Sequence, residues 1–184
     1  MASRIVRNLR DRFHHHIAPV ACVYCDFQQS QVQTIESIVA SILEQFVQGL
    51  NVTPQDLVDL YEQHASNKTR PTLDELEITI NKICKQVVRT YLVIDALDEY
   101  RDSLTIINML NRLQYCGTNI LITSRHSTSI DNRLREVVQV EIRAHEDDLV
   151  QYVEYRLPSL QCIQRRPDIQ AKVTEGIVKA SDGM

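Results

Sequence analysis

Apolar residues in this chain recur at two spacings, which predict alternating strands and helices. Short apolar runs predict buried strands at 19–27, 90–95, 118–125 and 136–143. Apolar residues at every third or fourth position predict helices at about 3–13, 33–50, 54–67, 72–87, 103–116, 146–157 and 168–181, with a further short helix between 125 and 136. This alternation is typical of an α/β protein in which helices flank both faces of a parallel sheet.

Polar residues mark where two of the helices begin. Thr53 precedes Pro54, which predicts a capping hydroxyl followed by a proline in the first helical position. The run T-L-D-E at 72–75 is a capping-box pattern, in which the threonine and the glutamate satisfy each other's backbone N–H groups. Both patterns support separate helices before the strand at 90–95.

Polar side chains follow several of the predicted strands. Asp26 and Asp95 end two of them, and the run Thr123-Ser124-Arg125 ends a third. In a parallel sheet the carboxyl ends of the strands lie along one edge, and ligands bind in the crevice outside that edge. We therefore expect these residues to lie together in a candidate binding site.

The run Y-L-V-I-D-A-L-D-E, residues 91–99, contributes three acids to that edge. Asp95 can hold Mg²⁺, directly or through water, beside a bound triphosphate. Glu99 lies one turn later, where it can polarise an attacking water, and Asp98 can support either role. The alternative is an acidic turn in which Asp98 or Asp102 only caps the helix that begins at 103.

Other polar groups have both functional and structural interpretations. The Arg125 guanidinium can pair with phosphate oxygens in a planar fork, or it can form a surface ion pair. Cys22 and Cys25 have the spacing of half a metal site, but side chains three apart on a strand face opposite sides, which favours buried structural thiols. The histidines at 14–16 are expected to form a polar helix end.

Composition excludes several classes of protein. Hydrophobic residues make up 43% of the 184 residues, which supports a folded core, and the net charge of −4 argues against a nucleic-acid binder. There is no signal peptide, and no apolar run approaches the roughly 18 residues of a membrane span. We expect a cytoplasmic protein that does not enter a membrane, with free thiols among its five cysteines.

Several segments together resemble a known family. Y-L-V-I-D-A-L-D-E-Y resembles the Walker B segment of NACHT domains, in the STAND class of P-loop NTPases, and N-I-L-I-T-S-R resembles their sensor strand. A-C-V-Y-C-D-F with the helix after it resembles the family's second strand, and I-V-K-A-S-D-G-M resembles the helical region that follows the nucleotide domain. The segments occur in the family's order. The similarity is greatest to the nephrocystin-like N-terminal group of fungal ankyrin-repeat proteins.

The resemblance implies a role for each candidate residue. Asp95 would coordinate Mg²⁺, Glu99 and Asp98 would be the catalytic acids, and Arg125 with Ser124 would contact ATP or GTP. Residues 1–143 would form a truncated NACHT domain, and 144–184 would begin the helical region after it. The family implies an NLR-like signalling switch with slow hydrolysis, whose flanking effector and repeat domains bind protein partners.

The sequence lacks one motif that the family requires, and its absence limits what the resemblance implies. A P-loop NTPase needs G-x-x-x-x-G-K-[ST], whereas the glycines here are at 49, 117, 176 and 183, and none precedes lysine. We expect the sequence to begin just after that loop, so that the chain alone binds nucleotide weakly and does not hydrolyse it usefully. The loop's strand would lie between 118–125 and 136–143. Its absence predicts either direct pairing of those two segments or exposed sheet edges.

Two other functions stay open from the residues alone. The chain could be a non-catalytic protein-interaction module or a degenerate gene fragment. It could also be a metal-dependent hydrolase with Asp95, Asp98 and Glu99 around one Mg²⁺, although nothing nearby supplies its nucleophile.

Overall fold

The computed structural model describes residues 2–13, 17–29, 32–125, 133–134, 137–143, 145–159 and 166–181. Contacts divide the chain into two units, Met1–Glu136 and Val137–Met184. The predicted domains, 1–143 and 144–184, remain a prediction. The histidines at 14–16, Cys162 and most of the short helix expected between 125 and 136 lie outside the described residues.

The first unit contains a parallel sheet of three described strands. They are β1 (Val20–Tyr24), β2 (Thr90–Asp95) and β3 (Thr118–Ile122), with β2 in the centre. Val23 pairs with Ile94, which pairs in turn with Ile122, so the three strands end at one edge. The predicted α/β class with a helix-flanked parallel sheet is confirmed.

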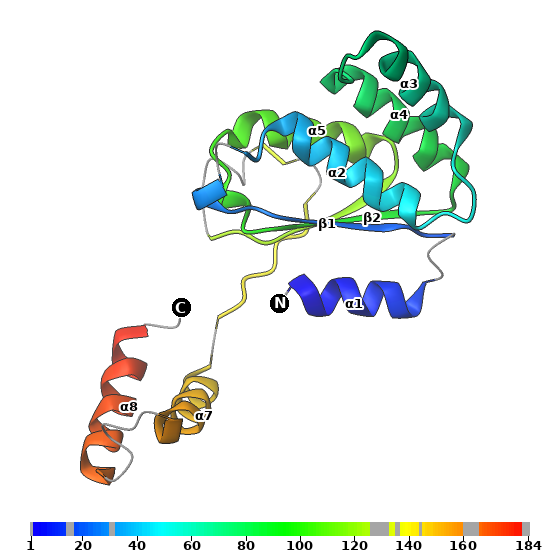
Figure 1. The fold of residues 1–184 in the computed structure, drawn as a ribbon. Helices are drawn as coiled ribbons and strands as arrows, with labels where there is room; N and C mark the ends of the chain where they lie inside the picture. Colours follow the sequence, from blue (N-terminus) through cyan, green and yellow to red (C-terminus); the bar gives the residue numbers. More distant parts are fainter. Residues whose placement is uncertain are drawn as a thin grey trace. The chain divides into compact units, whose positions relative to one another are not determined.

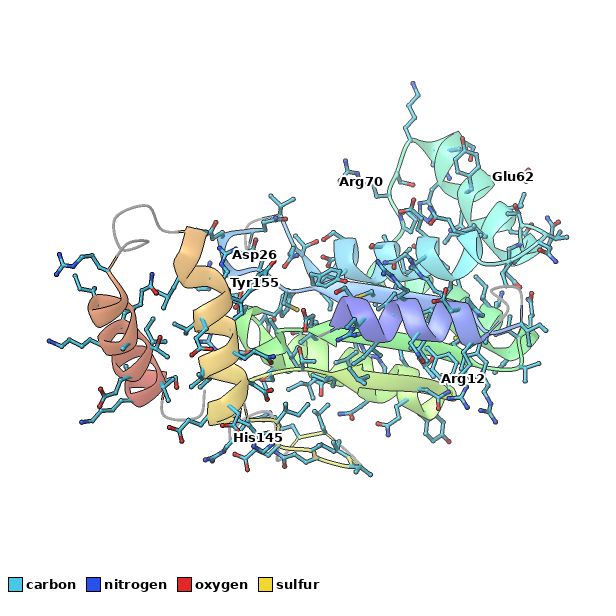
Figure 2. All side chains as sticks on the ribbon, turned by 90° about the horizontal axis from the view of Figure 1, so that it is seen from below. Arg12, Asp26, Glu62, Arg70, His145 and Tyr155 are labelled. Carbon is cyan, nitrogen blue, oxygen red and sulfur yellow. The ribbon has the colours of Figure 1, made fainter. Side chains whose placement is uncertain are left out.

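Helices cover both faces of this sheet (Figure 1). In chain order the helices of this unit are α1 (Ala2–Arg12), α2 (Ile35–Gln48), α3 (Gln55–Asn67), α4 (Leu73–Gln86) and α5 (Ser103–Tyr115), and α3 packs against α4. The main core joins α2, α4 and α5 to the sheet face that carries Leu92 and Ile94, both fully buried. On the other face, Val6 of α1 packs with Val20 and Val93, and α1 lies over β1 and β2 (Figure 2).

Of the two helix starts that the sequence predicts, the one at Thr72 is confirmed and the one at Thr53 is not. Thr72 and Glu75 form the capping box, with the Thr72 backbone N–H donating to Glu75 Oε2 at 2.8 Å. The start at Thr53 is wrong. Pro54 itself is the capping residue, in the extended conformation with ψ 137, and the helix begins at Gln55.

The strand predicted at 136–143 is also wrong within the described residues. Residues 137–143 belong to no sheet, and Val138, Val140 and Ile142 are 89%, 72% and 63% exposed. A strand needs a neighbour for its backbone N–H and C=O groups. No strand among the described residues pairs with this segment, so the direct pairing that the sequence allowed is not seen there.

The second unit holds two helices after that segment. They are α7 (Glu146–Arg156), which continues into η3 (Leu157–Ser159), and α8 (Pro167–Ser181). α7 packs against α8, and Val153 and Leu157 are buried. In the part of the chain that the structure describes, no helix has the length and apolar character needed to cross a bilayer.

A partly buried ion pair joins α4 to α5. The Arg112 guanidinium donates from Nε to Glu77 Oε2 at 2.6 Å and from Nη2 to Glu77 Oε1 at 2.5 Å. Glu77 is 8% exposed, whereas the Arg112 side chain is half-exposed. The fork therefore neutralises a carboxylate that has little access to water.

We expect Arg112→Ala to lower the free energy of unfolding by about 2 kcal/mol, because it leaves the Glu77 carboxylate buried without a partner. The double variant Glu77→Ala/Arg112→Ala should recover part of that loss, since no unpaired charge remains. Urea unfolding measures both effects. Arg89→Ala is the control, because Arg89 is exposed. An equal loss at Arg89 and Arg112 would contradict a role for the fork.

Candidate functional site at the carboxyl edge of the sheet

The turn after β2 is anchored to the end of β3. Ala96 has φ 56 and ψ 50, and the short helix η2 (Leu97–Glu99) follows it. Leu97 is fully buried, and its backbone N–H donates to Thr123 O at 2.9 Å. The Thr123 N–H donates in turn to Ile94 O at 2.9 Å. The turn that carries the acids is therefore held in place by both strands.

Asp95 is half-buried at the end of β2 and has a defined partner. The Thr123 hydroxyl donates to Asp95 Oδ1 and accepts a hydrogen bond of 3.0 Å from the Ala96 N–H. One hydroxyl thus orients the Asp95 carboxylate and the backbone of the turn together. The sequence interpretation placed Thr123 at the edge but assigned it no role.

Asp98 and Arg125 contact each other across the edge. Arg125 donates from Nε to Asp98 Oδ2 at 2.7 Å and from its backbone N–H to Asp98 Oδ1 at 3.1 Å. Burial acts to raise the pKa of Asp98, but the two hydrogen bonds from Arg125 outweigh it, so that the pKa lies below its ordinary value. The Arg125 side chain is 82% exposed, which leaves it open to solvent while paired.

Glu99 and Ser124 complete the predicted set. Glu99 is half-buried, and its backbone N–H donates to Ala96 O at 2.9 Å. The Ser124 hydroxyl is exposed and donates to Arg125 O at 2.7 Å, within its own segment. Asp102 caps α5 by accepting from the Thr105 N–H, so the capping role considered for Asp98 belongs to Asp102.

A buried thiol lies near all three acids. The Cys25 N–H donates to Asp95 O at 2.9 Å, which extends the β1–β2 pairing by one residue. Burial first, and then the charges of Asp95, Glu99 and Asp98, together raise the pKa of the Cys25 thiol to about 11. The thiol is therefore protonated at neutral pH. Cys25 belongs to the main core and Cys22 to the α1 face, as the strand geometry predicted.

The acids do not converge into a set of three metal ligands. Among the described residues, no three His, Cys, Asp or Glu side chains are arranged to hold one metal ion. The hydrolase alternative, which requires Asp95, Asp98 and Glu99 around one Mg²⁺, gains no support from this arrangement.

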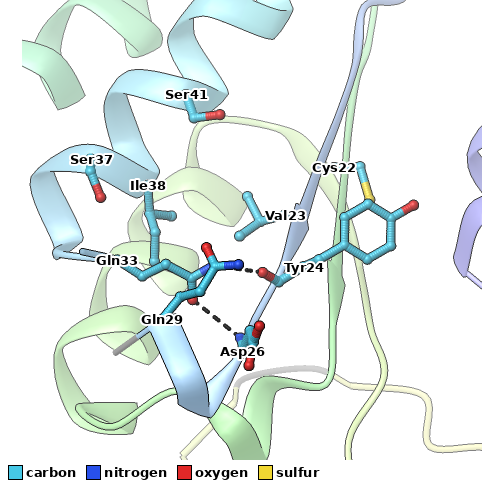
Figure 3. A pocket seen from close by; sticks show the side chains of 9 residues that line it. All are labelled: Cys22, Val23, Tyr24, Asp26, Gln29, Gln33, Ser37, Ile38 and Ser41. Atoms are coloured by element: carbon cyan, nitrogen blue, oxygen red, sulfur yellow. Dashed lines mark hydrogen bonds between the residues drawn. The ribbon is translucent and has the colours of Figure 1, made fainter. Parts of the chain in front are cut away.

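A hollow of ≈ 390 Å³ lies beside the site, between β1 and α2 (Figure 3). Its lining combines apolar side chains with the polar side chains of Asp26, Gln33, Ser37 and Ser41. Among the described residues that line it, Asp26 is the acid that belongs to the carboxyl edge. The Gln33 amide spans the hollow, donating to Tyr24 O at 2.8 Å and accepting from the Asp26 N–H at 3.2 Å.

The fold and this edge define an α/β protein with acids and an arginine at the carboxyl ends of a parallel sheet. The chain belongs to the nephrocystin 3 N-terminal family, whose model matches residues 1–125. This confirms the nephrocystin-like part of the predicted resemblance.

Other comparisons add little. No curated protein matches the chain. Among solved structures, the chain is similar to one titled "Structure of C. elegans PCH-2", with 11% identity and a TM-score of 0.35. The likeness covers 88% of this chain and 45% of that one, so the chain spans less than half of that structure's length.

The left-handed conformation at Ala96 makes a prediction about stability. The left-handed backbone conformation destabilises a residue that has a Cβ by about 1 kcal/mol or more, whereas glycine adopts it without that cost. We expect Ala96→Gly to leave the free energy of unfolding unchanged or raised. Ala40→Gly, at an exposed position of α2, should lower it by about 1 kcal/mol. Thermal unfolding compares the two, and equal losses would argue against strain at Ala96.

The Asp98–Arg125 pair makes a prediction about pH. Because the folded-state pKa of Asp98 is lowered, its stabilising contribution is present above the unfolded-state value near 4 and is lost as pH falls through the folded-state value. The difference in unfolding free energy between the wild type and Asp98→Asn should be constant from about pH 7 to 5 and shrink below about 4. Urea titrations across that range measure it. A pH-independent difference would show that the pair does not stabilise the fold.

Proposed function

We propose that the chain carries the acids and the sensor arginine of a NACHT-type nucleotide-binding switch, in a cytoplasmic signalling protein of the NLR-like kind. The observation that supports this is the contact of Asp98 with Arg125 beside Asp95 at the carboxyl edge. In open parallel sheets, ligands bind at that edge. Residues at the ends of two adjacent strands, β2 and β3, contact each other there.

The donors at the edge fit a Mg²⁺ ion that keeps most of its waters. Mg²⁺ is commonly held by one or two carboxylates together with substrate phosphates, rather than by a full set of protein ligands. Asp95 is half-buried and oriented by Thr123, which suits one such contact. When bound, the ion would neutralise charge on phosphate oxygens.

The other side chains have separate roles in the proposal. Arg125 would pair with the terminal phosphate of ATP or GTP and would have to release Asp98 to do so. Glu99 would orient the water, with Asp98 supporting it, and the Ser124 hydroxyl would donate to the nucleotide. The sequence contains no G-x-x-x-x-G-K-[ST] loop, so these groups alone would bind nucleotide weakly and would not hydrolyse it efficiently.

The interaction module is the second candidate, and the Asp98–Arg125 pair also favours it. Because the guanidinium already has a carboxylate partner, a phosphate gains less by binding there than at a free arginine. In this alternative the edge is structural. Protein partners would bind through this unit or through flanking effector and repeat domains.

Calorimetric titration with Mg·ATP and Mg·GTP separates the two functions. The switch predicts saturable binding with a Kd in the millimolar range, about −4 kcal/mol. Asp95→Asn should weaken it at least tenfold, because it removes the charge that faces the cation. Glu62→Gln, at an exposed position of α3, is the matched control and should bind like the wild type. Heat changes that do not saturate, or equal binding by the wild type and Asp95→Asn, would contradict the switch proposal and favour the interaction module.

A further inference from the structure

A glutamine side chain of α2 contacts the outer edge of β1, the edge that faces away from β2. The Cys25 N–H donates to Asp95 O of β2 at 2.9 Å. Peptide groups alternate in direction along a strand, so those of Cys22 and Tyr24 face outward. Gln45 accepts from the Cys22 N–H at 2.9 Å and donates to Cys22 O at 3.0 Å. One side-chain amide therefore pairs both outward groups of Cys22.

A second glutamine covers the carboxyl end of the same edge. Gln33, just before α2, donates to Tyr24 O at 2.8 Å and accepts from the Asp26 N–H at 3.2 Å (Figure 3). Gln33 and Gln45 thus make the same kind of contact, a donor and an acceptor together, at two places along β1. A neighbouring strand would satisfy these backbone groups in the same way.

Side chains, rather than the backbone of α2, close this edge. The hollow of ≈ 390 Å³ lies between α2 and β1, and its lining includes Cys22, Tyr24 and Gln33. The helix therefore leaves space beside the strand, and the glutamine amides reach across that space. Without the two amides, the outward peptide groups of β1 would face the hollow and solvent.

The β1 strand has none of the usual features that discourage pairing with another chain. The run V-A-C-V-Y contains no charged residue and no proline, and its register with β2 is unbroken from Val20 to Tyr24. Edge strands are commonly protected by lysine, proline or a bulge. An uncharged run of this kind at an exposed edge favours self-association. This edge therefore depends on other groups for its protection.

We propose that Gln33 and Gln45 form an autoinhibitory cap, which prevents the β1 edge from pairing with the β1 edge of a second copy. The two amides occupy the peptide groups that such pairing would use. The partner is a second copy because β1 presents the same uncharged edge in every copy, and two identical edges can pair about a two-fold axis. The cap acts whether or not the carboxyl edge binds a nucleotide.

The test replaces the two amides in the full chain by side chains of similar length that cannot form these hydrogen bonds. Gln33→Met/Gln45→Met should self-associate at least tenfold more tightly than the wild type in sedimentation equilibrium from about 1 to 200 μM, under reducing conditions. Gln48→Met is the matched control and should behave like the wild type. Gln48 lies on the same helix, is exposed, and donates to Glu44 Oε1 at 3.0 Å.

Hydrogen exchange locates the association on the molecule. At about 1 μM the Cys22 amide should exchange at least tenfold faster in the double variant than in the wild type, because Gln45 no longer accepts from it. At about 200 μM its exchange in the double variant should slow again, because β1 then pairs with β1 of another copy.

Three results would overturn the proposal. A double variant that associates no more tightly than Gln48→Met would show that the amides do not prevent pairing. Equal exchange of the Cys22 amide in the wild type and the double variant at the low concentration would show that Gln45 does not cover the edge. Association that leaves this amide in fast exchange would mean that the copies meet through another surface. Circular dichroism identifies a double variant that fails to fold, and Gln45→Met then replaces it in the same measurements.

Discussion

Thr123 connects β2, β3 and the turn that carries the acids. Its backbone N–H extends the ladder between β3 and β2, its carbonyl holds Leu97, and its hydroxyl joins the Ala96 N–H to the Asp95 carboxylate. Four polar groups that would otherwise have to find water are paired by one residue. Because Leu97 is fully buried, the turn cannot shift without disturbing the core. The positions of Asp95, Asp98 and Glu99 therefore follow from the packing of β2 and β3 rather than from the acids themselves.

This anchoring fixes the positions of three carboxylates at one edge of the sheet. Their mutual repulsion is reduced in two ways, since Asp95 accepts from a hydroxyl and Asp98 is paired with a guanidinium. Burial and the charges of all three acids raise the pKa of the Cys25 thiol, so the thiol stays protonated. An acidic edge of this kind costs free energy unless a cation offsets it, and among the described residues Arg125 pairs with Asp98 there. The same contact thus stabilises the edge and occupies the group that would meet a phosphate.

Sequence patterns predicted those parts of the structure that depend on local or repeated features. The apolar runs at 90–95 and 118–125, the capping box at Thr72 and the gathering of polar residues at one edge follow from side-chain period and from parallel topology. The pairing of Asp98 with Arg125 was one of two possibilities for that arginine, and only tertiary contact could decide it. Gln33 and Gln45 bond to the backbone of β1 and gave no signal, because a glutamine in a helix or just before one has no pattern that marks such a contact.

The wrong prediction at 136–143 shows a different limit. Alternation correctly describes residues that suit a half-buried strand, but a strand forms only where a partner accepts its hydrogen bonds. Residues 137–143 have the alternating pattern, but no strand among the described residues pairs with them. The runs at 90–95 and 118–122 did form strands because each pairs along its length with a neighbour, β1 with β2 and β2 with β3. The pattern states which side chains suit a strand, whereas the backbone hydrogen bonds of a neighbouring strand decide whether one forms.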